Sequence, residues 1–301
     1  MIKEKTPPPL KDESGISLNE LISDFDKIPL ENNTIVFIHS GFKSLGKVNG
    51  GAQTIVDALI KSFIEKRNIT IAMPSFTIYG TMKETLVNKN TFDVRNTKTV
   101  FKEIPLTFQQ YPGIERSIHP THSVTALGPK AKWLVSSHHT CGSTFGKGSP
   151  LGKLLDHKSY ILGLGTRLGT VTFYHVLEDM EPNFPFRVYT EDSPFDSTCI
   201  DHQGKHIKLK VYAHDGSISP VRIDRRNGGW LRDIYTAILE KNAGLQWFHV
   251  GKAKTWVCDS DKLYKEQKRL SFSGLSIYST EVDVANYISK TLTNTNKSEN
   301  G

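Results

Sequence analysis

Apolar runs and amphipathic stretches alternate along the first two thirds of the chain. The segments 34–41, 69–76 and 158–165 are continuous apolar runs that end at a glycine or a proline, a pattern typical of strands buried on both faces. Between the first two runs, segment 50–66 places apolar residues at helical spacing after two glycines. This succession of strand, helix and strand predicts a βαβ unit, and therefore an α/β fold with a largely parallel central sheet.

Shorter patterns predict the flanking elements. Ser17 followed by Glu20 forms a capping box, which predicts that an amphipathic helix begins there. Segment 199–213 alternates polar and apolar residues around Gly204, which predicts a hairpin and hence a small antiparallel excursion from the main sheet. An amphipathic helix is expected over 230–239.

No linker or change of composition divides the chain into two domains. We expect one domain over residues 16–292, with a loop-rich stretch at 78–118. Residues 1–15, which contain three successive prolines, are expected to form a flexible lead, and the polar residues 293–301 a disordered tail.

Composition narrows the class of protein. The three cysteines contain no C-x-x-C pair, so neither a disulfide framework nor a cysteine zinc site is indicated. The N-terminus is polar and no segment is apolar enough to span a membrane, so we expect a cytoplasmic protein without a membrane partner. The net charge of +7 favours an anionic partner. Because the basic residues are scattered, a phosphorylated small molecule fits better than nucleic acid.

Two glycine- and hydroxyl-rich segments lie near ends of predicted strands, where open α/β sheets bind ligands. Segment 39–51 contains serines, a lysine and backbone amides that could bind phosphate, although it is no Walker A loop and could be a purely structural turn. Segment 115–128 offers an arginine, two histidines and several hydroxyls for a polar pocket wall. No third ligand at a recognisable spacing accompanies His119 and His122, so no metal site is predicted.

A third segment combines a glycine-rich turn, 163–170, with a helix predicted over 169–180. On that helix Glu178 would share a face with His175 and could hold the imidazole in one tautomer. A neutral imidazole can remove a proton from an attacking amine. The alternative is a helix-surface histidine with an incidental neighbour.

Taken in order, these motifs resemble the aminoglycoside 3-N-acetyltransferase family, also called the antibiotic N-acetyltransferase family. The matching motifs are H-S-x-x-x-S-L-G at 39–46 with G-G-A at 50–52, M-P-S-F at 73–76, R-S-I-H-P at 116–120 with Ser123 and A-L-G at 126–128, F-G-K-G-S-P-L at 145–151, and L-G at 162–163 through Thr172, His175 and Glu178. The resemblance implies a three-layer α/β/α fold, acetyl-CoA or another acyl-CoA as co-substrate, and no metal.

The resemblance also implies roles for residues. The catalytic pair would be His175 as general base and Glu178 as its orienting partner. The implied cofactor-binding residues are His39, Ser40, Lys43, Ser44, Leu45, Gly46, Pro74, Ser75, Phe76, Arg116, Ser117 and His119. The expected substrate-binding residues are Phe76, His122, Asp179, Glu181, Phe184 and Arg187.

The expected acceptor is an amine of an amino sugar, of the aminoglycoside type that the resemblance implies or of a nucleotide-linked type. The basic net charge fits an anionic acceptor more easily, whereas the acidic residues that follow His175 could attract a cationic one.

Two other functions are kept as alternatives. One is a non-catalytic CoA-binding protein of the same fold. The other is an NAD(P)-dependent oxidoreductase, although the glycines at 163–169 run G-x-G-x-x-x-G, where the dinucleotide fingerprint requires G-x-G-x-x-G. A covalent intermediate on Cys141 is disfavoured, and a homodimer stays an option.

Overall fold

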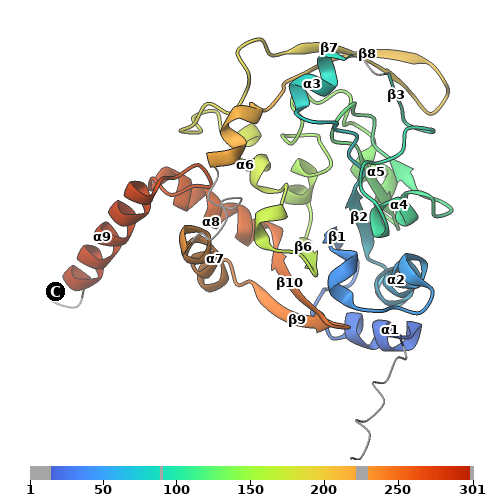
Figure 1. Cartoon of the computed structure of the whole chain (residues 1–301), viewed down its shortest axis with the longest axis horizontal. Coiled ribbons are helices and arrows are strands. Elements are labelled where there is room, and N and C mark those ends of the chain that lie inside the picture. The colour runs from blue at the N-terminus through green and yellow to red at the C-terminus, as the bar shows by residue number, and fades with distance from the viewer. Residues whose placement is uncertain (1–14, 89–90, 222–229, 299–301) are drawn as a thin grey trace, which may run out of the picture.

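The computed structural model describes residues 15–88, 91–221 and 230–298. The expected flexible lead, 1–15, falls outside the described residues apart from Gly15. The chain forms a seven-stranded sheet and a separate three-stranded sheet, with helices around them (Figure 1).

The large sheet has the strand order β4-β5-β2-β1-β6-β10-β9. Its strands are β1 (Ile35–Ser40), β2 (Thr70–Pro74), β4 (Glu115–Arg116), β5 (Val124–Leu127), β6 (Ser159–Leu164), β9 (Gln246–Val250) and β10 (Ala253–Asp259). The central strand β1 pairs in parallel with both β2 and β6. The flanking pairs are antiparallel: β5 pairs with β2, β10 pairs with β6, and the edge strands β4 and β9 join β5 and β10 as hairpins. The predicted α/β class and parallel centre are confirmed, and the flanks make the sheet mixed.

Helices cover both faces of this sheet. The principal helices are α1 (Leu18–Asp26), α2 (Gly51–Leu59), α4 (Ile104–Gln109), α5 (Ala131–Val135), α6 (Tyr174–Met180), α7 (Trp230–Asn242) and α8 (Ser260–Phe272). Alternate residues of β1 belong to two apolar cores: Val36 and Ile38 pack with α1, α2 and α4, whereas Ile35 and Phe37 face α5 to α8. Burial on both faces explains the continuous apolar run of this strand. The predicted three-layer arrangement is therefore present.

Most of the other predicted elements are also found. The capping box at Ser17 and Glu20 opens α1. The predicted hairpin consists of β7 (Phe195–Ile200) and β8 (His206–Val211), and with β3 (Phe92–Asp93) it forms the small sheet. Figure 1 shows this hairpin beside α3 (Met82–Val87), away from the large sheet. Among the described residues, no helix combines the length and apolarity that a membrane crossing requires.

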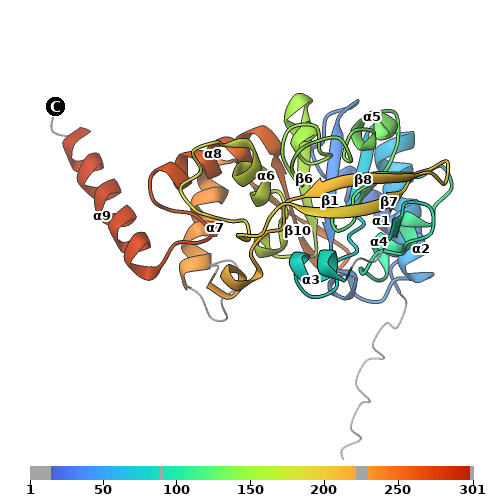
Figure 2. The same cartoon turned by 90° about the horizontal axis from the view of Figure 1, so that it is seen from above.

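The prediction for the C-terminal tail is corrected. Helix α9 spans Glu281–Ser298 and leads away from the body of the molecule in both views (Figures 1 and 2), so residues 293–298, which were expected to be disordered, are helical. Val284 anchors the first turn in the apolar core, and Tyr287 packs there one turn later. No glycine or proline follows within the helix, so nothing in the sequence ends it near residue 292.

The ends of β1 and β6 lie side by side and bring two loops together. Ser40 is opposite Leu164 in the strand register. Gly165 has a φ of 64°, and a Cβ there would lie 2.0 Å from Ser44 Oγ. Gly163 lies against Trp256, whose indole N–H donates to the Thr166 carbonyl at 3.0 Å. These close approaches require glycine, and they hold the loop after β6 against the loop after β1.

Candidate active site

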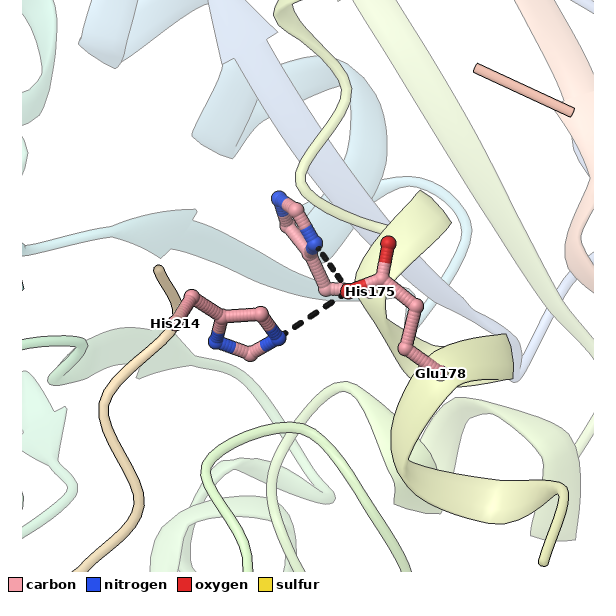
Figure 3. A group of neighbouring side chains, drawn as sticks. All are labelled: His175, Glu178 and His214. Atoms are coloured by element: carbon pink, nitrogen blue, oxygen red, sulfur yellow. Dashed lines mark hydrogen bonds and ion pairs between the residues drawn. The ribbon is translucent and has the colours of Figure 1, made fainter. Parts of the chain in front are cut away.

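Helix α6 presents His175 and Glu178 on one face, one turn apart. His175 Nδ1 lies 2.7 Å from Glu178 Oε2 (Figure 3). The helix is shorter than the predicted 169–180 segment: a 3₁₀ turn over Leu168–Thr170 precedes it, and the α-helix begins at Tyr174.

Two side chains from distant parts of the chain complete this cluster. His214, in the segment after β8, places Nε2 3.0 Å from the same Glu178 Oε2 (Figure 3). Tyr278, in the loop before α9, donates its hydroxyl to Glu178 Oε1 at 2.5 Å. The sequence analysis identified neither residue, because nothing local in the sequence connects them with α6.

Glu178 is ionised despite its burial. Its side chain is only 1% exposed, and this burial by itself would raise the pKa of the carboxyl group. The charges and hydrogen bonds of His175 and His214 outweigh burial and hold the pKa of Glu178 well below its ordinary value. His175 contacts one carboxylate oxygen and the Tyr278 hydroxyl donates to the other, while His214 Nε2 lies at ion-pair distance, so both oxygens have partners.

His175 opens into a cavity of about 210 Å³, which we call the histidine cavity. Its lining residues are Ile78, Gly80, Thr81, Met82, His122, Phe145, His175, His214, Asp215, Gly216, Ile218 and Tyr278. The Phe145 ring stacks on His175 with centroids 5.2 Å apart and also contacts His122 at 4.7 Å. Of the predicted substrate-binding residues, His122 therefore lies in the wall of this cavity.

Phe76 lies between the histidine cavity and a second cavity. Its ring is 4.5 Å from that of His122 and 5.5 Å from that of Phe101. Phe101 lines the second cavity, of about 420 Å³, together with Ser40, Lys43, Ser44 and Lys102 of the loops around β1. We call this one the loop cavity.

A third cavity, of about 460 Å³, shares Ser44 and Gly165 with the loop cavity. Its wall carries three cationic side chains, one carboxylate and an indole, and we call it the basic cavity; these residues are Arg167, Lys252, Lys254, Asp233 and Trp247. The Ser44 hydroxyl donates to the Gly165 carbonyl at 2.9 Å. Ser40, Lys43 and Ser44, which were predicted to bind the cofactor, therefore line cavities with several cationic side chains.

The other predicted residues of the first motif have structural positions. The Leu45 side chain is fully buried in the apolar core. Gly46 has a φ of 88°, and a Cβ there would lie 3.0 Å from the side chain of Lys252. His39 is buried beside Phe37, and burial lowers its pKa to about 4. These positions do not support the side-chain contacts with cofactor that were expected of Leu45 and His39.

Arg116 is held inside the protein, where it was expected to bind the cofactor. Its guanidinium donates to Ser123 Oγ at 2.9 Å, to the Ser75 carbonyl at 3.1 Å and to the Thr97 carbonyl. Its side chain also lies over the Phe92 ring. Arg116 therefore ties loops together, and its position does not support the predicted contact with cofactor.

Ser75, Ser117 and His119 are buried as well. Pro74 ends β2 in the sheet interior. The Ser117 hydroxyl lies 2.9 Å from His138 Nδ1, and His138 Nε2 lies 2.9 Å from the Thr144 carbonyl. Ser117 thus belongs to a buried polar network, and the positions of these four residues do not support the predicted side-chain contacts with cofactor.

This network predicts acid sensitivity. Burial lowers the pKa of His138 to about 3, whereas the pKa of a histidine in an unfolded chain is about 6.5. Below about pH 6.5 His138 binds a proton in the unfolded chain but stays neutral in the folded protein. The free energy of unfolding therefore falls by about 1.4 kcal/mol for each unit by which the pH is lowered. Urea unfolding from pH 6.5 to pH 5 should show a shallower pH slope in His138→Asn than in the wild type. An unchanged slope would contradict the assignment of a neutral His138.

Three predicted substrate-binding residues are engaged elsewhere. Asp179 has a fully buried side chain, accepts the Phe145 backbone N–H at 2.7 Å, and has a pKa raised by burial. Glu181 pairs with Lys268 at 2.6 Å. Arg187 is exposed and pairs with Glu191. Direct contact with substrate is therefore not supported for these three.

Phe184, also predicted to bind substrate, lies in an aromatic group behind the carboxylate. Its ring centroid is 5.8 Å from that of Phe186, which in turn is 5.6 Å from that of Tyr278. Phe184 thus packs beside a residue that lines the histidine cavity.

The three residues His175, Glu178 and His214 also offer metal-ligand atoms within 4.8 Å of one another. In the described structure Glu178 contacts the two imidazoles directly, at 2.7 and 3.0 Å.

Comparison with known proteins identifies the family. The family profile described as aminoglycoside 3-N-acetyltransferase matches residues 37–270. The chain belongs to this family. This match confirms the resemblance that the sequence motifs indicated.

Individual relatives are distant. An aminoglycoside N(3')-acetyltransferase-like protein of Bacillus subtilis, YokD, is 30% identical over 175 residues, covering 52% of this chain and 63% of YokD. An aminoglycoside N(3)-acetyltransferase III of Serratia marcescens is 26% identical over 177 residues, covering 55% of this chain and 65% of the relative. The alignments thus span less than two thirds of these relatives.

Solved structures extend the likeness of fold. The complex of AAC-IIIb with CoASH superposes with a TM-score of 0.68 at 20% identity, covering 85% of this chain and 98% of that one. The AAC(3)-IVa apoenzyme superposes with a TM-score of 0.67 at 19% identity, covering 86% and 90%.

Proposed function

We propose that this protein transfers an acetyl group from acetyl-CoA to an amine of an amino sugar, of aminoglycoside or nucleotide-linked type, with His175 as the general base. The observation that carries the proposal is the contact of His175 Nδ1 with the buried, ionised carboxylate of Glu178. His175 also lines a cavity. Family membership supports acyl transfer, and the CoASH complex of AAC-IIIb supports an acyl-CoA co-substrate.

The hydrogen bond to Glu178 determines which nitrogen acts as the base. A carboxylate only accepts, so Nδ1 of the neutral imidazole carries the proton and Nε2 has the lone pair. The amine nitrogen attacks the thioester carbonyl, a C–N bond forms, and the C–S bond breaks. His175 Nε2 takes the proton from the amine and passes it to the sulfur of the leaving CoA. The products are the N-acetylated amine and CoA with a free thiol.

Glu178 supports this step electrostatically. When Nε2 takes the proton, the imidazole becomes a cation beside a carboxylate that is already ionised and oriented. Because the carboxylate is buried, the ion pair is screened less than it would be in water. His214 and Tyr278 hold the carboxylate in place through its two oxygens.

The loop and basic cavities are the proposed CoA site. They adjoin the carboxyl ends of β1 and β6, where α/β sheets bind their ligands. Lys43 and Lys102 on one side, and Arg167, Lys252 and Lys254 on the other, supply positive charge for phosphate groups. Phe76 connects this region to the histidine cavity through its ring contacts with Phe101 and His122.

Reversing one of these charges should weaken CoA binding. Lys43→Glu is expected to raise KM for acetyl-CoA about tenfold with kcat little changed, because the charge contacts cofactor equally before and during the reaction. Lys61→Glu, at an exposed lysine outside the three cavities, is the matched control and should leave KM unchanged. A normal KM in Lys43→Glu would place the phosphates elsewhere.

Thermal denaturation with nucleotides distinguishes the proposed class from an oxidoreductase. CoA at about 100 times its Kd should stabilise the fold by about 2.7 kcal/mol and raise Tm, whereas NAD should not. A rise of Tm with NAD or NADP alone would favour the dinucleotide alternative.

A further inference from the structure

The histidine cavity carries little negative charge. Among its lining residues that the structure describes, Asp215 is the one carboxylate. Hydrogen bonds from Ser217 lower the pKa of Asp215, so it is ionised at neutral pH. The Glu178 carboxylate lies behind His175 and is already surrounded by donors.

The charged groups that act on Asp215 from neighbouring segments are cations. Arg187 and Lys83 both lower its pKa through their charge. Lys83 pairs with Asp192 at 2.6 Å, and Arg187 pairs with Glu191 at 2.9 Å. Among the described residues, each of these two carboxylates therefore already has a cationic partner at the surface.

The imidazoles of the cavity do not change this balance. Burial, and the charges of His214, His175 and His138, hold the pKa of His122 well below its ordinary value, so its ring is neutral. The remaining wall is mainly apolar or aromatic, and its large side chains are Ile78, Met82, Phe145, Ile218 and Tyr278.

The cavity is also small. Its volume of about 210 Å³ lies below the range of about 300–1,000 Å³ that is usual for drug-sized ligands. One ring with an amino group fits this space better than a chain of several rings.

We propose that the acceptor is a compact amine with a single positive charge and an apolar or ring face, rather than a polycationic aminoglycoside. This inference rests on the proposed acetyl transfer. Asp215 attracts the ammonium form of the amine, and Phe145 and Tyr278 provide flat surfaces for the rest of the molecule. Additional ammonium groups would enter an apolar wall without carboxylate partners, which costs free energy.

Acceptor competition tests the inference. We would measure kcat/KM by thiol release from acetyl-CoA for two compact monoamines, glucosamine and tyramine, and for two aminoglycosides, sisomicin and gentamicin. At least one monoamine should exceed both aminoglycosides by about tenfold or more, equivalent to about 1.4 kcal/mol. A higher kcat/KM for either aminoglycoside would overturn the inference and leave the proposed function intact. Absence of thiol release with all four amines and with a nucleotide-linked amino sugar, while CoA still raises Tm, would contradict the proposed function itself.

A charge-insertion variant provides a second readout. Ile78→Glu adds a carboxylate to the partly buried cavity wall and should raise kcat/KM for sisomicin about tenfold relative to tyramine. Val87→Glu is the matched control, because Val87 is 54% exposed and does not line the cavity. Tm measurements confirm that both variants fold. An equal selectivity ratio in Ile78→Glu and the wild type would contradict the charge argument.

Discussion

His175→Ala is expected to lower kcat/KM for amine acetylation by about 10²–10⁴-fold, the usual contribution of a general base. The reason is geometric: His175 lines the histidine cavity and is oriented by Glu178. CoA binding should survive, because the proposed CoA site is built from other segments. Steady-state kinetics and the CoA-induced rise in Tm, measured on the same preparation, separate loss of chemistry from loss of binding.

His206→Ala is the matched control for this substitution. His206 is an exposed histidine at the start of β8 and has no contact with the cluster around Glu178. Its removal should leave both kcat/KM and Tm unchanged. Full activity in His175→Ala with a verified acceptor would show that another group removes the proton.

Glu178→Gln is expected to lower kcat/KM by about 10²-fold or more, because loss of the carboxylate removes both the tautomer control and the negative charge beside the imidazolium. In the variant, the amide NH₂ group would face His175, His214 and Tyr278, which surround the carboxylate in the wild type. A buried donor left without an acceptor costs about 1–3 kcal/mol. The variant should therefore lose stability as well as rate, which kinetics and urea unfolding measure together.

Glu191→Gln is the control for the second substitution. The Glu191 side chain is 87% exposed and pairs only at the surface, so its free energy of unfolding should stay within about 0.5 kcal/mol of the wild type. If Glu178→Gln lowers the stability but leaves kcat/KM unchanged, the carboxylate has a purely structural role.

The parts of the fold that the sequence predicted are those with strong local patterns. The buried run of β1 and the capping box of α1 each occupy a single short segment, so their residues are read without knowledge of the rest of the chain. The edge strand β9 was not predicted, because its polar Gln246 and His249 interrupt the apolar run. Its place in the sheet comes from pairing with β10, which is a tertiary contact.

The same distinction applies to the site. His175 and Glu178 share one helix, and their spacing predicts their contact. Tyr278 lies 100 residues from Glu178 along the chain, and no local pattern connects them. The resemblance implied that Arg116 binds the cofactor, yet backbone carbonyls from distant segments take its hydrogen bonds. The sequence shows which side chains are charged, whereas the groups that a charged side chain contacts depend on the fold.

The most direct test of the central claim is to measure free CoA thiol and N-acetylated amine together, with wild-type protein and His175→Ala, acetyl-CoA and the acceptor panel. The account predicts that the wild type forms thiol and acetylated amine in equal amounts, and that both nearly disappear in the variant while CoA still raises Tm. CoA binding without product for any amine would instead indicate a non-catalytic CoA-binding protein, and equal product from both proteins would contradict the role of His175.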